Sequence, residues 1–327
     1  MTTPAIIGID LGKRTFHLHA QTRHGNLLFR KVLSRHNLLR HLAQQPACLV
    51  VMESCAGSHY WARQIQALGH DVRLVPPQYV KPFVKTNKHD FADAEAICEA
   101  ASCPAMRFAA IKSEDQQILS ALHRTRQGLV AERTAVMNRL QGFLLEFGVA
   151  LPVGHSAIRH LDPHLDDLPA AFVALAYRLQ AHYSVLCEEI AALEKDIEQR
   201  TQCDDAARRL MTIPGIGPIT ASAIVGLAGD ASHYRSGRAF AASLGLVPRQ
   251  YATGGKPRLL GISKRGDSHL RRLLVQGARA VMQRQDQRHD RLGDWLRELG
   301  CRRHSNVVAC ALAKGGEFRP SPGATLA

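Results

Sequence analysis

Apolar and polar residues along the first hundred positions follow the short periods of strands, interrupted by helical stretches. Residues 6–10 form an apolar run typical of a buried strand, and Phe16, Leu18 and Ala20 alternate with polar residues at a period of two. The same reading predicts further strands at 26–33, 48–52 and 72–75, and helices at 36–45, 60–68 and 90–102. Strands alternating with helices predict an α/β domain.

The middle of the chain has a helical pattern. Residues 113–147 contain no proline, and a second helix is expected over 170–201 after a proline-containing connector. The positions expected to pack are Ile118, Leu122, Leu129, Val136, Leu140 and Leu144, then Leu175, Leu179, His182, Leu186, Leu193 and Ile197. We expect an antiparallel helical hairpin, serving either as an arm within one chain or as a dimerisation coil.

Two glycines mark a turn in the last part of the chain. Gly215 and Gly217 stand in the sequence LMTIPGIGPITASAI, between two apolar stretches. Backbone N–H groups at such a turn can bind phosphate, as in helix-hairpin-helix motifs that contact the DNA backbone. A plain packed turn is the alternative. The surrounding pattern predicts a small, mainly α domain.

These patterns give a fold class of α/β plus α with three domains. The boundaries are 1–108, 109–204 for the coiled-coil arm, and 205–327 for the C-terminal domain. In the first domain, three strands are followed by helix, strand, helix, strand and helix. This is the element order of a RuvC or ribonuclease-H-like fold.

Charge is the unusual part of the composition. The 327 residues carry a formal net charge of +14, and 46% of them are hydrophobic, which excludes a disordered or fibrous chain. The net charge is +6 over 1–108, −4 over 109–204 and +12 over 205–327. The peak, 235–272, has nine basic residues and one acid. This distribution predicts a polyanionic partner, namely nucleic acid.

Other features argue against a membrane or an oxidising compartment. The longest uncharged stretch, 210–229, contains two prolines and four glycines, and the first residues lack the basic start of a signal peptide. Eight cysteines include no C-x-x-C pair, as expected of reduced thiols. We therefore expect a cytoplasmic, nucleoid-associated bacterial protein with no membrane contact.

Four acids are candidate metal ligands. Asp10 ends the first strand and Glu53 ends a later one, while Asp90 and Asp93 are spaced i, i+3 on one helix face. Carboxylates that converge repel one another, and Mg²⁺ (or Mn²⁺) relieves that repulsion. The alternatives are that Asp90 is a helix N-cap and Asp93 a first-turn acid. His89 is expected on the surface, and Glu95 is expected to point elsewhere.

The sequence IGIDLG, a strand followed by a turn, also begins the phosphate-binding loop of sugar kinases and actin-like ATPases. Those proteins add a second glycine-rich phosphate loop with an aspartate, and this sequence has no such element. The spacing of Asp90 and Asp93 is more typical of nucleases and transposases than of these kinases and ATPases.

Together, the motifs resemble one family over nearly the whole chain. They are IGID at 7–10, MES at 52–54, NKHDFADAEAI at 87–97, IPGIGPITASA at 213–223, FAASLGLVPRQY at 240–251, TGGKPRLLGISKRGD at 253–267 and LRRLLVQGARA at 270–280. The chain resembles a DEDD transposase of the IS110 family, in its IS1111 subgroup of bridge-RNA-guided recombinases.

The resemblance implies a function and a site. Asp10, Glu53, Asp90 and Asp93 would be the metal-binding acids. The acids of one subunit would complete a composite site with the nucleophile of another, in a dimer of dimers. A C-terminal serine would attack DNA, giving a covalent protein–phosphate link and a free 3′-hydroxyl. The implied partners are double-stranded target and donor DNA, a structured noncoding guide RNA and further copies of the chain, as a dimer or tetramer.

The chain departs from the family pattern at the serine. The family has Ser-Thr-Gly-Gly or Ser-Ser-Gly-Gly after the GLVPRQ motif, but this chain reads Ala252-Thr253-Gly254-Gly255. If the nucleophile position is 252, this copy has lost its nucleophile, which is the reading we favour from sequence. If it is 253, a threonine hydroxyl attacks from a more crowded Cβ. The family also continues with an apolar helix where this chain becomes Gly/Pro-rich, after residue 314.

Basic residues near this motif are candidates for nucleic-acid binding. The phosphate contacts expected are Arg249, Lys256, Arg258, Lys264 and Arg265, with Arg271 and Arg272 at a helix start where one of them can act locally. Arg124, Arg126, Arg133 and Arg139 on the first arm helix either hold RNA or form surface ion pairs. Two other functions stay open: a RuvC-type metal-dependent junction nuclease and a non-catalytic nucleic-acid-binding protein.

Overall fold

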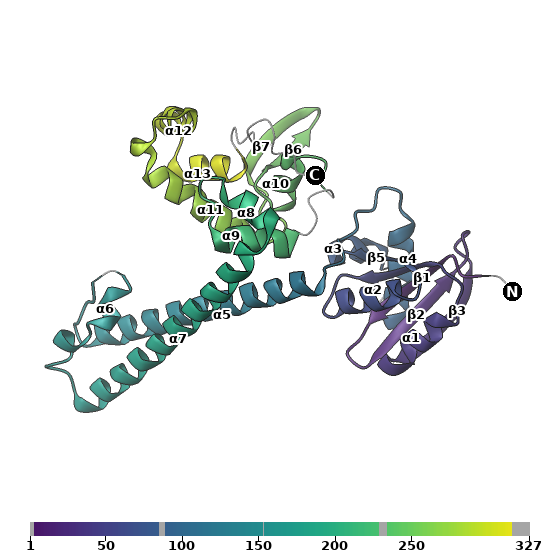
Figure 1. The fold of residues 1–327 in the computed structure, drawn as a ribbon, viewed down its shortest axis with the longest axis horizontal. Coiled ribbons are helices and arrows are strands. Elements are labelled where there is room, and N and C mark those ends of the chain that lie inside the picture. Colours follow the sequence, from purple (N-terminus) through teal and green to yellow (C-terminus); the bar gives the residue numbers. More distant parts are fainter. Residues whose placement is uncertain (1–2, 85–88, 153, 229–233, 316–327) are drawn as a thin grey trace. The chain divides into compact units, whose positions relative to one another are not determined.

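The computed structural model describes residues 3–84, 89–152, 154–228 and 234–315 (Figure 1). The chain divides into two compact units, residues 1–113 and 114–327. The division falls close to the end of the predicted first domain. The arm and the C-terminal helices belong to one unit, so the boundary expected at 204/205 stays a prediction.

Unit 1 is a mixed sheet covered by helices. The strands β1 (Ile6–Leu11), β2 (Thr15–Gln21), β3 (Leu27–Ser34), β4 (Leu49–Glu53) and β5 (Asp71–Val75) lie in the order β3-β2-β1-β4-β5. β1 pairs antiparallel with β2 and parallel with β4. The helices are α1 (Arg35–Ala43), α2 (Ser58–Gln66), α3 (Pro77–Val80), η1 (Lys81–Phe83) and α4 (Asp90–Ser102). The predicted α/β domain is therefore confirmed.

The period of two along the strands decides which face each residue occupies. Ile7 and Ile9 of β1 share a buried cluster with Phe16 and Leu18 of β2 and with side chains of α1 and α2. The residues between them face the other side, where α4 packs against β1 and β2. Asp10 is on this second face because it lies two residues after Gly8, which touches α4.

Unit 2 begins with two long helices, α5 (Glu114–Glu146) and α7 (Ala170–Gln202), packed as an antiparallel hairpin (Figure 1). The connector contains α6 (Ser156–Arg159) and η2 (Asp162–His164). Val136, Leu140, Leu144 and Leu186 are buried as predicted. The predicted hairpin is therefore present in the structure.

Some of the predicted packing positions are wrong. Ile118 and Leu175 are 41% and 42% exposed, and the side chain of His182 is 46% exposed. Their immediate neighbours Leu119 and Ala176 are buried instead, as is Tyr183, whose hydroxyl lies 2.6 Å from Nδ1 of His155 in the connector. The predicted positions Leu186 and Ile197 of α7 are buried, but at 175 and 182 the buried residue is the next one along the chain.

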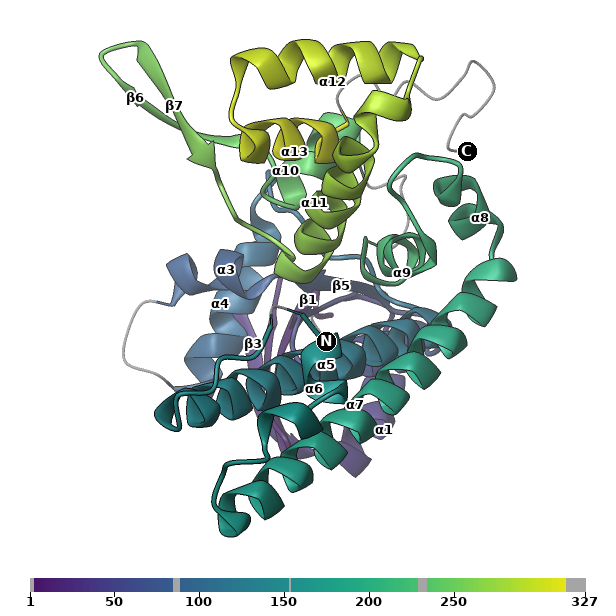
Figure 2. The ribbon, with the colours of Figure 1, turned by 90° about the vertical axis from the view of Figure 1, so that its left-hand side faces the viewer.

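The remaining elements of unit 2 are mostly short helices. They are α8 (Asp205–Met211), α9 (Pro218–Ala223), a π-helix η3 (Ile224–Ala228), α10 (Gly237–Ser243), α11 (Ser268–Gln283), η5 (Gln285–Gln287), α12 (Arg291–Arg302) and α13 (Ser305–Ala313). Between α10 and α11 the chain forms a β-hairpin, β6 (Pro248–Thr253) and β7 (Lys256–Ile262), seen extending from the helices in Figure 2. The mainly α prediction for this part missed these two strands.

The glycines of the predicted helix-hairpin-helix turn have different surroundings. Gly215 has φ +85°, and a Cβ there would lie 2.7 Å from the carbonyl oxygen of Gly277 in α11. Gly217 has open space around it. Close helix packing therefore explains Gly215, and phosphate binding by this turn stays a prediction.

Within the described part of the chain, no helix is long and apolar enough to cross a bilayer. All eight cysteines are free thiols. The Gly/Pro-rich tail discussed above falls almost entirely on 316–327, outside the described residues.

Candidate active site

Two of the four acids come from neighbouring parallel strands. The register of β1 and β4 pairs Ile9 with Met52, so Asp10 and Glu53 are the next residues on the two strands. Carboxyl ends of parallel strands meet at one edge of a sheet. The sequence-based expectation that these two acids emerge together is thus met by the strand register.

The first turn of α4 brings the other two acids. The Phe91 N–H donates to Nδ1 of His89 at 3.2 Å, so His89 is the N-cap and Asp90 is the first residue of the helix. The alternative that Asp90 is the cap is wrong, because its neighbour already fills that role. Ligand oxygens of Asp10, Asp90 and Asp93 all lie within 4.8 Å of one another.

Glu53 lies beside this cluster, and its pKa is affected by the charge of the neighbouring acids. Burial raises the pKa of Glu53, and the nearby Asp10 and Asp93 raise that pKa further, against an opposing effect of Lys81 in η1. The pKa of Cys55 is also raised, first by burial and then by Glu53 and Asp10. Negative charge is therefore concentrated at this edge, and hard oxygen ligands in such a group suit a divalent cation such as Mg²⁺.

Gly8 explains how α4 comes so close to the strand. A Cβ at this position would lie 2.4 Å from the carbonyl oxygen of Ala94 and 2.6 Å from Sγ of Cys98. The absence of a side chain lets the helix backbone rest directly on β1. Asp90 and Asp93 reach Asp10 because the strand two residues earlier has no side chain to hold the helix away.

Sequence reasoning missed the histidine beside the cluster. His17 pairs with Asp10 across β1 and β2, and its Nε2 lies 3.6 Å from Oδ2 of Asp90. Its ring packs edge-on against Phe91, at 5.1 Å between centroids. The available signal was the period of two, which places residue 17 on the same sheet face as Asp10 once the strands are paired.

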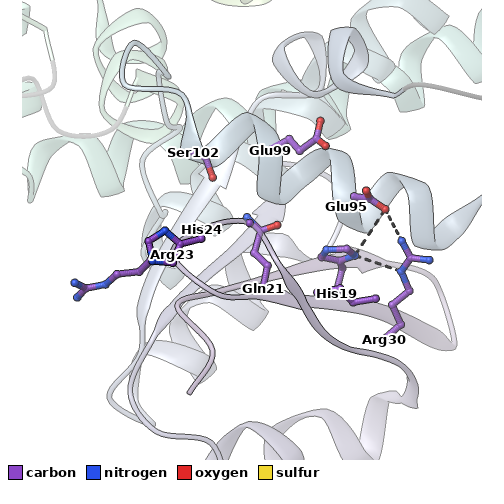
Figure 3. Close-up of a pocket in the computed structure, with 10 residues that line it drawn as sticks. His19, Gln21, Arg23, His24, Arg30, Glu95, Glu99 and Ser102 are labelled. Atoms are coloured by element: carbon purple, nitrogen blue, oxygen red, sulfur yellow. Dashed lines mark hydrogen bonds and ion pairs between the residues drawn. The ribbon is translucent and has the colours of Figure 1, made fainter. Parts of the chain in front are cut away.

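A polar pocket of about 420 Å³ lies further along α4 (Figure 3). Glu95 points into it and away from the acid cluster, as expected, and accepts a 2.5 Å hydrogen bond from Nη2 of Arg30. His19, only 3% exposed, lies 3.9 Å from the same carboxylate. Burial lowers the pKa of His19 against the opposing effect of Glu95. These contacts join β2 and β3 to α4 behind the acid cluster.

The predicted nucleophile motif lies on the hairpin. Gly254 and Gly255 form its two-residue turn, with φ of +57° and +76°, the conformation that a tight hairpin turn requires. Every residue of β6 is exposed, and so are all residues of β7 except Ile262. Ala252 pairs with Pro257, and Thr253 pairs with Lys256. Both candidate nucleophile positions are therefore accessible.

Comparison with known proteins identifies the chain. Residues 7–148 match the transposase family of the DEDD, IS110 type, and residues 207–292 match the Transposase IS116/IS110/IS902 family. The chain is 54% identical over 315 residues to a transposase for insertion sequence element IS1328 from Yersinia enterocolitica, covering 96% of this chain and 94% of the relative.

This chain belongs to the IS116/IS110/IS902 family of transposases. A probable family 20 transposase from Pseudomonas aeruginosa is 47% identical, covering 94% of this chain and 93% of that relative. A transposase for element IS1111A from Coxiella burnetii is 35% identical, covering 94% of this chain and 86% of that relative. The protein is thus an insertion-sequence transposase that acts on DNA. A transposase of the DEDD type implies a divalent metal, and the structure contains the acidic cluster of Asp10, Asp90 and Asp93.

The base of the transposase hairpin is fastened by a compact loop. The Ser263 N–H donates to the Val247 carbonyl at 2.8 Å, and the Lys264 N–H donates to the Gly245 carbonyl at 3.1 Å. Lys264 is in the left-handed region, with φ +56°. Arg271 donates to the carbonyls of Leu244 and Arg265 at 2.7 and 3.1 Å. Arg271 therefore acts locally on the loop, as one of the two helix-start arginines was expected to do.

The other candidate cations of the transposase differ in their surroundings. Lys264 and Arg265 are exposed at the base of the hairpin, and Arg272 is in the first turn of α11. On the arm, Arg126 forms an ion pair with Glu194 of α7, which is the local alternative to holding RNA. Arg124 and Arg139 are exposed.

Proposed function

We propose that this transposase cuts and rejoins target and donor DNA under the guidance of a structured noncoding RNA, as a member of the IS1111 subgroup. The observation that carries the catalytic part is the convergence of Asp10, Asp90 and Asp93 within 4.8 Å. The strand order of unit 1 supports a RuvC-like domain. The relative from element IS1111A and the shared motifs support the subgroup.

Asp10, Glu53, Asp90 and Asp93 would hold Mg²⁺ or Mn²⁺. The pKa of Glu53 is raised first by burial and then by Asp10 and Asp93, and this second contribution supports the fit, because a cation would offset the repulsion among the acids. When bound, the ion supplies positive charge for the phosphate oxygens during phosphoryl transfer. His17 lies close enough to Asp90 to restrict its carboxylate, and Gly8 keeps α4 within reach.

For the nucleophile, we propose Thr253. Alternation along β6 places Thr253 on the face that carries the basic side chains, while Ala252 shares the other face with Pro257. The threonine oxygen attacks a DNA phosphorus and the bond from phosphorus to the 3′ oxygen breaks. The proton leaves the threonine hydroxyl and a proton joins the departing 3′ oxygen. This geometry favours position 253 over the inactivated-copy reading that we preferred from sequence.

The partners in this proposal are nucleic acids and further subunits. The net charge of +12 over residues 205–327 supports phosphate binding by Arg249, Lys256, Arg258, Lys264, Arg265 and Arg272. Arg124, Arg133 and Arg139 are proposed to hold the guide RNA. Catalytic acids from one subunit would act with the hairpin of another in a tetramer. Association with the nucleoid would follow from DNA binding.

Covalent protein–DNA adducts test the proposal. The intact chain is incubated with Mg²⁺, the noncoding RNA of the element, and target and donor DNA labelled at the 3′ end, because that end stays attached to the protein. We expect adducts that disappear in Thr253→Ala and in Asp93→Asn. Adducts formed only by Ala252→Ser would show instead that this copy is inactivated at position 252.

Two other outcomes would replace the proposal. Strand cleavage that needs Mg²⁺ but neither RNA nor an adduct would indicate a RuvC-type junction nuclease. DNA binding without cleavage, even in Ala252→Ser, would indicate a non-catalytic nucleic-acid-binding protein. Gel separation under denaturing conditions distinguishes adducts from simple cleavage, because only an adduct carries the label with the protein. A gel shift under native conditions shows binding without cleavage.

A further inference from the structure

The two faces of the β6–β7 hairpin differ in chemistry. Opposed residues of an antiparallel pair share a face, and the register pairs Tyr251 with Arg258 and Thr253 with Lys256. The register is irregular between Pro248 and Gln250, so Arg249 is assigned to neither face. The opposite face carries Gln250, Ala252, Pro257 and Leu259. Lys256 and Arg258 therefore lie on one face of the hairpin, together with Tyr251 and Thr253.

Tyr251 is placed as a contact group and not as a core residue. Its side chain is 64% exposed, although a tyrosine normally buries most of its ring. Among the described residues, the ion pairs found involve none of Arg249, Lys256 and Arg258. The face thus combines an open ring with two cations, Lys256 and Arg258, and no acid.

We propose that Tyr251 stacks on an unpaired base of the DNA strand that is cut, directly next to the scissile phosphate. An aromatic ring between cations suits single-stranded nucleic acid, since the ring takes a base and the cations take the phosphates on either side. A duplex offers no exposed base face to such a ring. This inference rests on the proposed function, because it takes Thr253 as the attacking group.

The spacing along the strand supports the position next to the cut. Tyr251 and Thr253 are two residues apart on one face of β6, which corresponds to about 7 Å at about 3.3 Å per residue. Successive nucleotides of an extended single strand are separated by a similar distance. A base on Tyr251 therefore places the neighbouring phosphate at Thr253, with Arg258 across the strand from the stacked base.

Bound DNA would also stabilise the hairpin. Two-stranded hairpins are marginally stable in water, and this one has no buried side of its own. Its base is held by the loop contacts of Lys264 and Arg271, but the tip contributes nothing to a core. A strand of DNA lying along the basic face would fix the tip in one conformation.

Fluorescence of a base analogue tests the stacking. The intact chain is titrated with a twelve-nucleotide single strand of thymidines with 2-aminopurine at its centre, following anisotropy for binding and analogue emission for stacking. We expect quenched emission with the parent chain and with Tyr251→Phe. In Tyr251→Ala we expect no quenching and binding about 5–150-fold weaker. Leu259→Ala, at an equally exposed apolar residue on the other face, is the matched control.

The results separate this inference from the proposed function. If Tyr251→Ala binds and quenches like the parent chain, or if Leu259→Ala is weakened as much, the stacking proposal is wrong. Thr253→Val should still bind and quench, because it keeps the face intact. If quenching persists but no variant forms an adduct, the recombinase proposal is wrong. The stacking site for single-stranded DNA would then still stand.

Discussion

The acid cluster and the hairpin are built in opposite ways. In unit 1, strand ends and a helix that rests on Gly8 bring Asp10, Asp90 and Asp93 together above a sheet with a buried core. In unit 2, Thr253 lies near the tip of a hairpin whose first strand is exposed throughout. The acids are positioned by the chain's own packing, whereas the hydroxyl would gain a fixed position only with a partner.

The largest expected effect comes from a glycine-to-alanine substitution at the acid cluster, compared with the same substitution in the hairpin. Gly8→Ala adds a Cβ 2.4 Å from a backbone oxygen, so α4 must move and carry Asp90 and Asp93 away from Asp10. We expect unfolding to become easier by about 1–3 kcal/mol and cleavage to fall about 100-fold. Thermal melting of the purified chain measures the first effect, and the rate at which covalent protein–DNA adducts form measures the second. Mn²⁺ titration shows whether the acids still converge.

Gly261→Ala in β7 is the matched control, since nothing lies within 4 Å of a Cβ there. Melting temperature and Mn²⁺ affinity should both stay at the parent values. If the two alanine variants behaved alike, the contrast between a packed site and an open hairpin would be lost.

A second prediction concerns acid stability of unit 2. His123 is fully buried, and its Nε2 lies 2.9 Å from Oγ of Ser222 in α9. Burial lowers its pKa to about 4, with smaller contributions from His269 and Arg126, against Asp267. Because the unfolded chain takes up the proton more readily, the stability from neutral His123 is full above about pH 6.5 and is lost as pH falls towards 4.

We expect a loss on the order of 3 kcal/mol between pH 6.5 and pH 4, measured by denaturant unfolding at each pH. His123→Gln keeps a hydrogen-bonding group without titrating and should remove most of that loss. His182→Gln, at a histidine of α7 that is 46% exposed and lies 3.3 Å from Glu132, is the comparison variant at an exposed position. An unchanged profile in His123→Gln would contradict the assignment.

The smallest expected effect is a gain in thermal stability, whereas the two effects above are losses. The pKa of Glu53 is raised, mainly by burial and then by Asp10 and Asp93, so its ionised form lowers stability as pH rises through that pKa. Without metal at pH 7, Glu53→Gln should therefore melt about 2 °C higher than the parent chain. The same variant should lose most of the stabilisation that Mn²⁺ gives the parent.

Scanning calorimetry with and without Mn²⁺ measures both changes. Glu99→Gln, at an acid on the same unit that faces the pocket, is the control and should keep the full response to Mn²⁺. A Glu53→Gln variant that melts lower without metal, or responds to Mn²⁺ like the parent, would show that the acid cluster is not held under mutual repulsion.

The sequence predicted the regular parts of this molecule well, because their patterns are local. The strands and helices of unit 1 follow from periods of two and 3.6, and the spacing of Asp90 and Asp93 on one helix follows from the same rule. The two helices of the arm were found because long stretches without proline favour helix.

The parts that were missed depend on contacts between distant residues. His17 becomes a neighbour of Asp90 only when β2 and α4 meet. Tyr183 is buried in place of His182, and its hydroxyl meets His155 of the connector only once the hairpin is folded. The hairpin was hidden because an exposed strand has no apolar period, although Gly254-Gly255 was a recognisable turn signal.

Cys98 gives the packed site an internal reporter. Its thiol lies beneath Gly8, lies 3.4 Å from the carbonyl of His19 and is completely buried, and burial raises its pKa to about 12. An alkylating reagent can reach this sulfur only while α4 is lifted from the sheet. The labelling rate of Cys98 therefore measures how often the transposase opens its own acid cluster, with no substrate added.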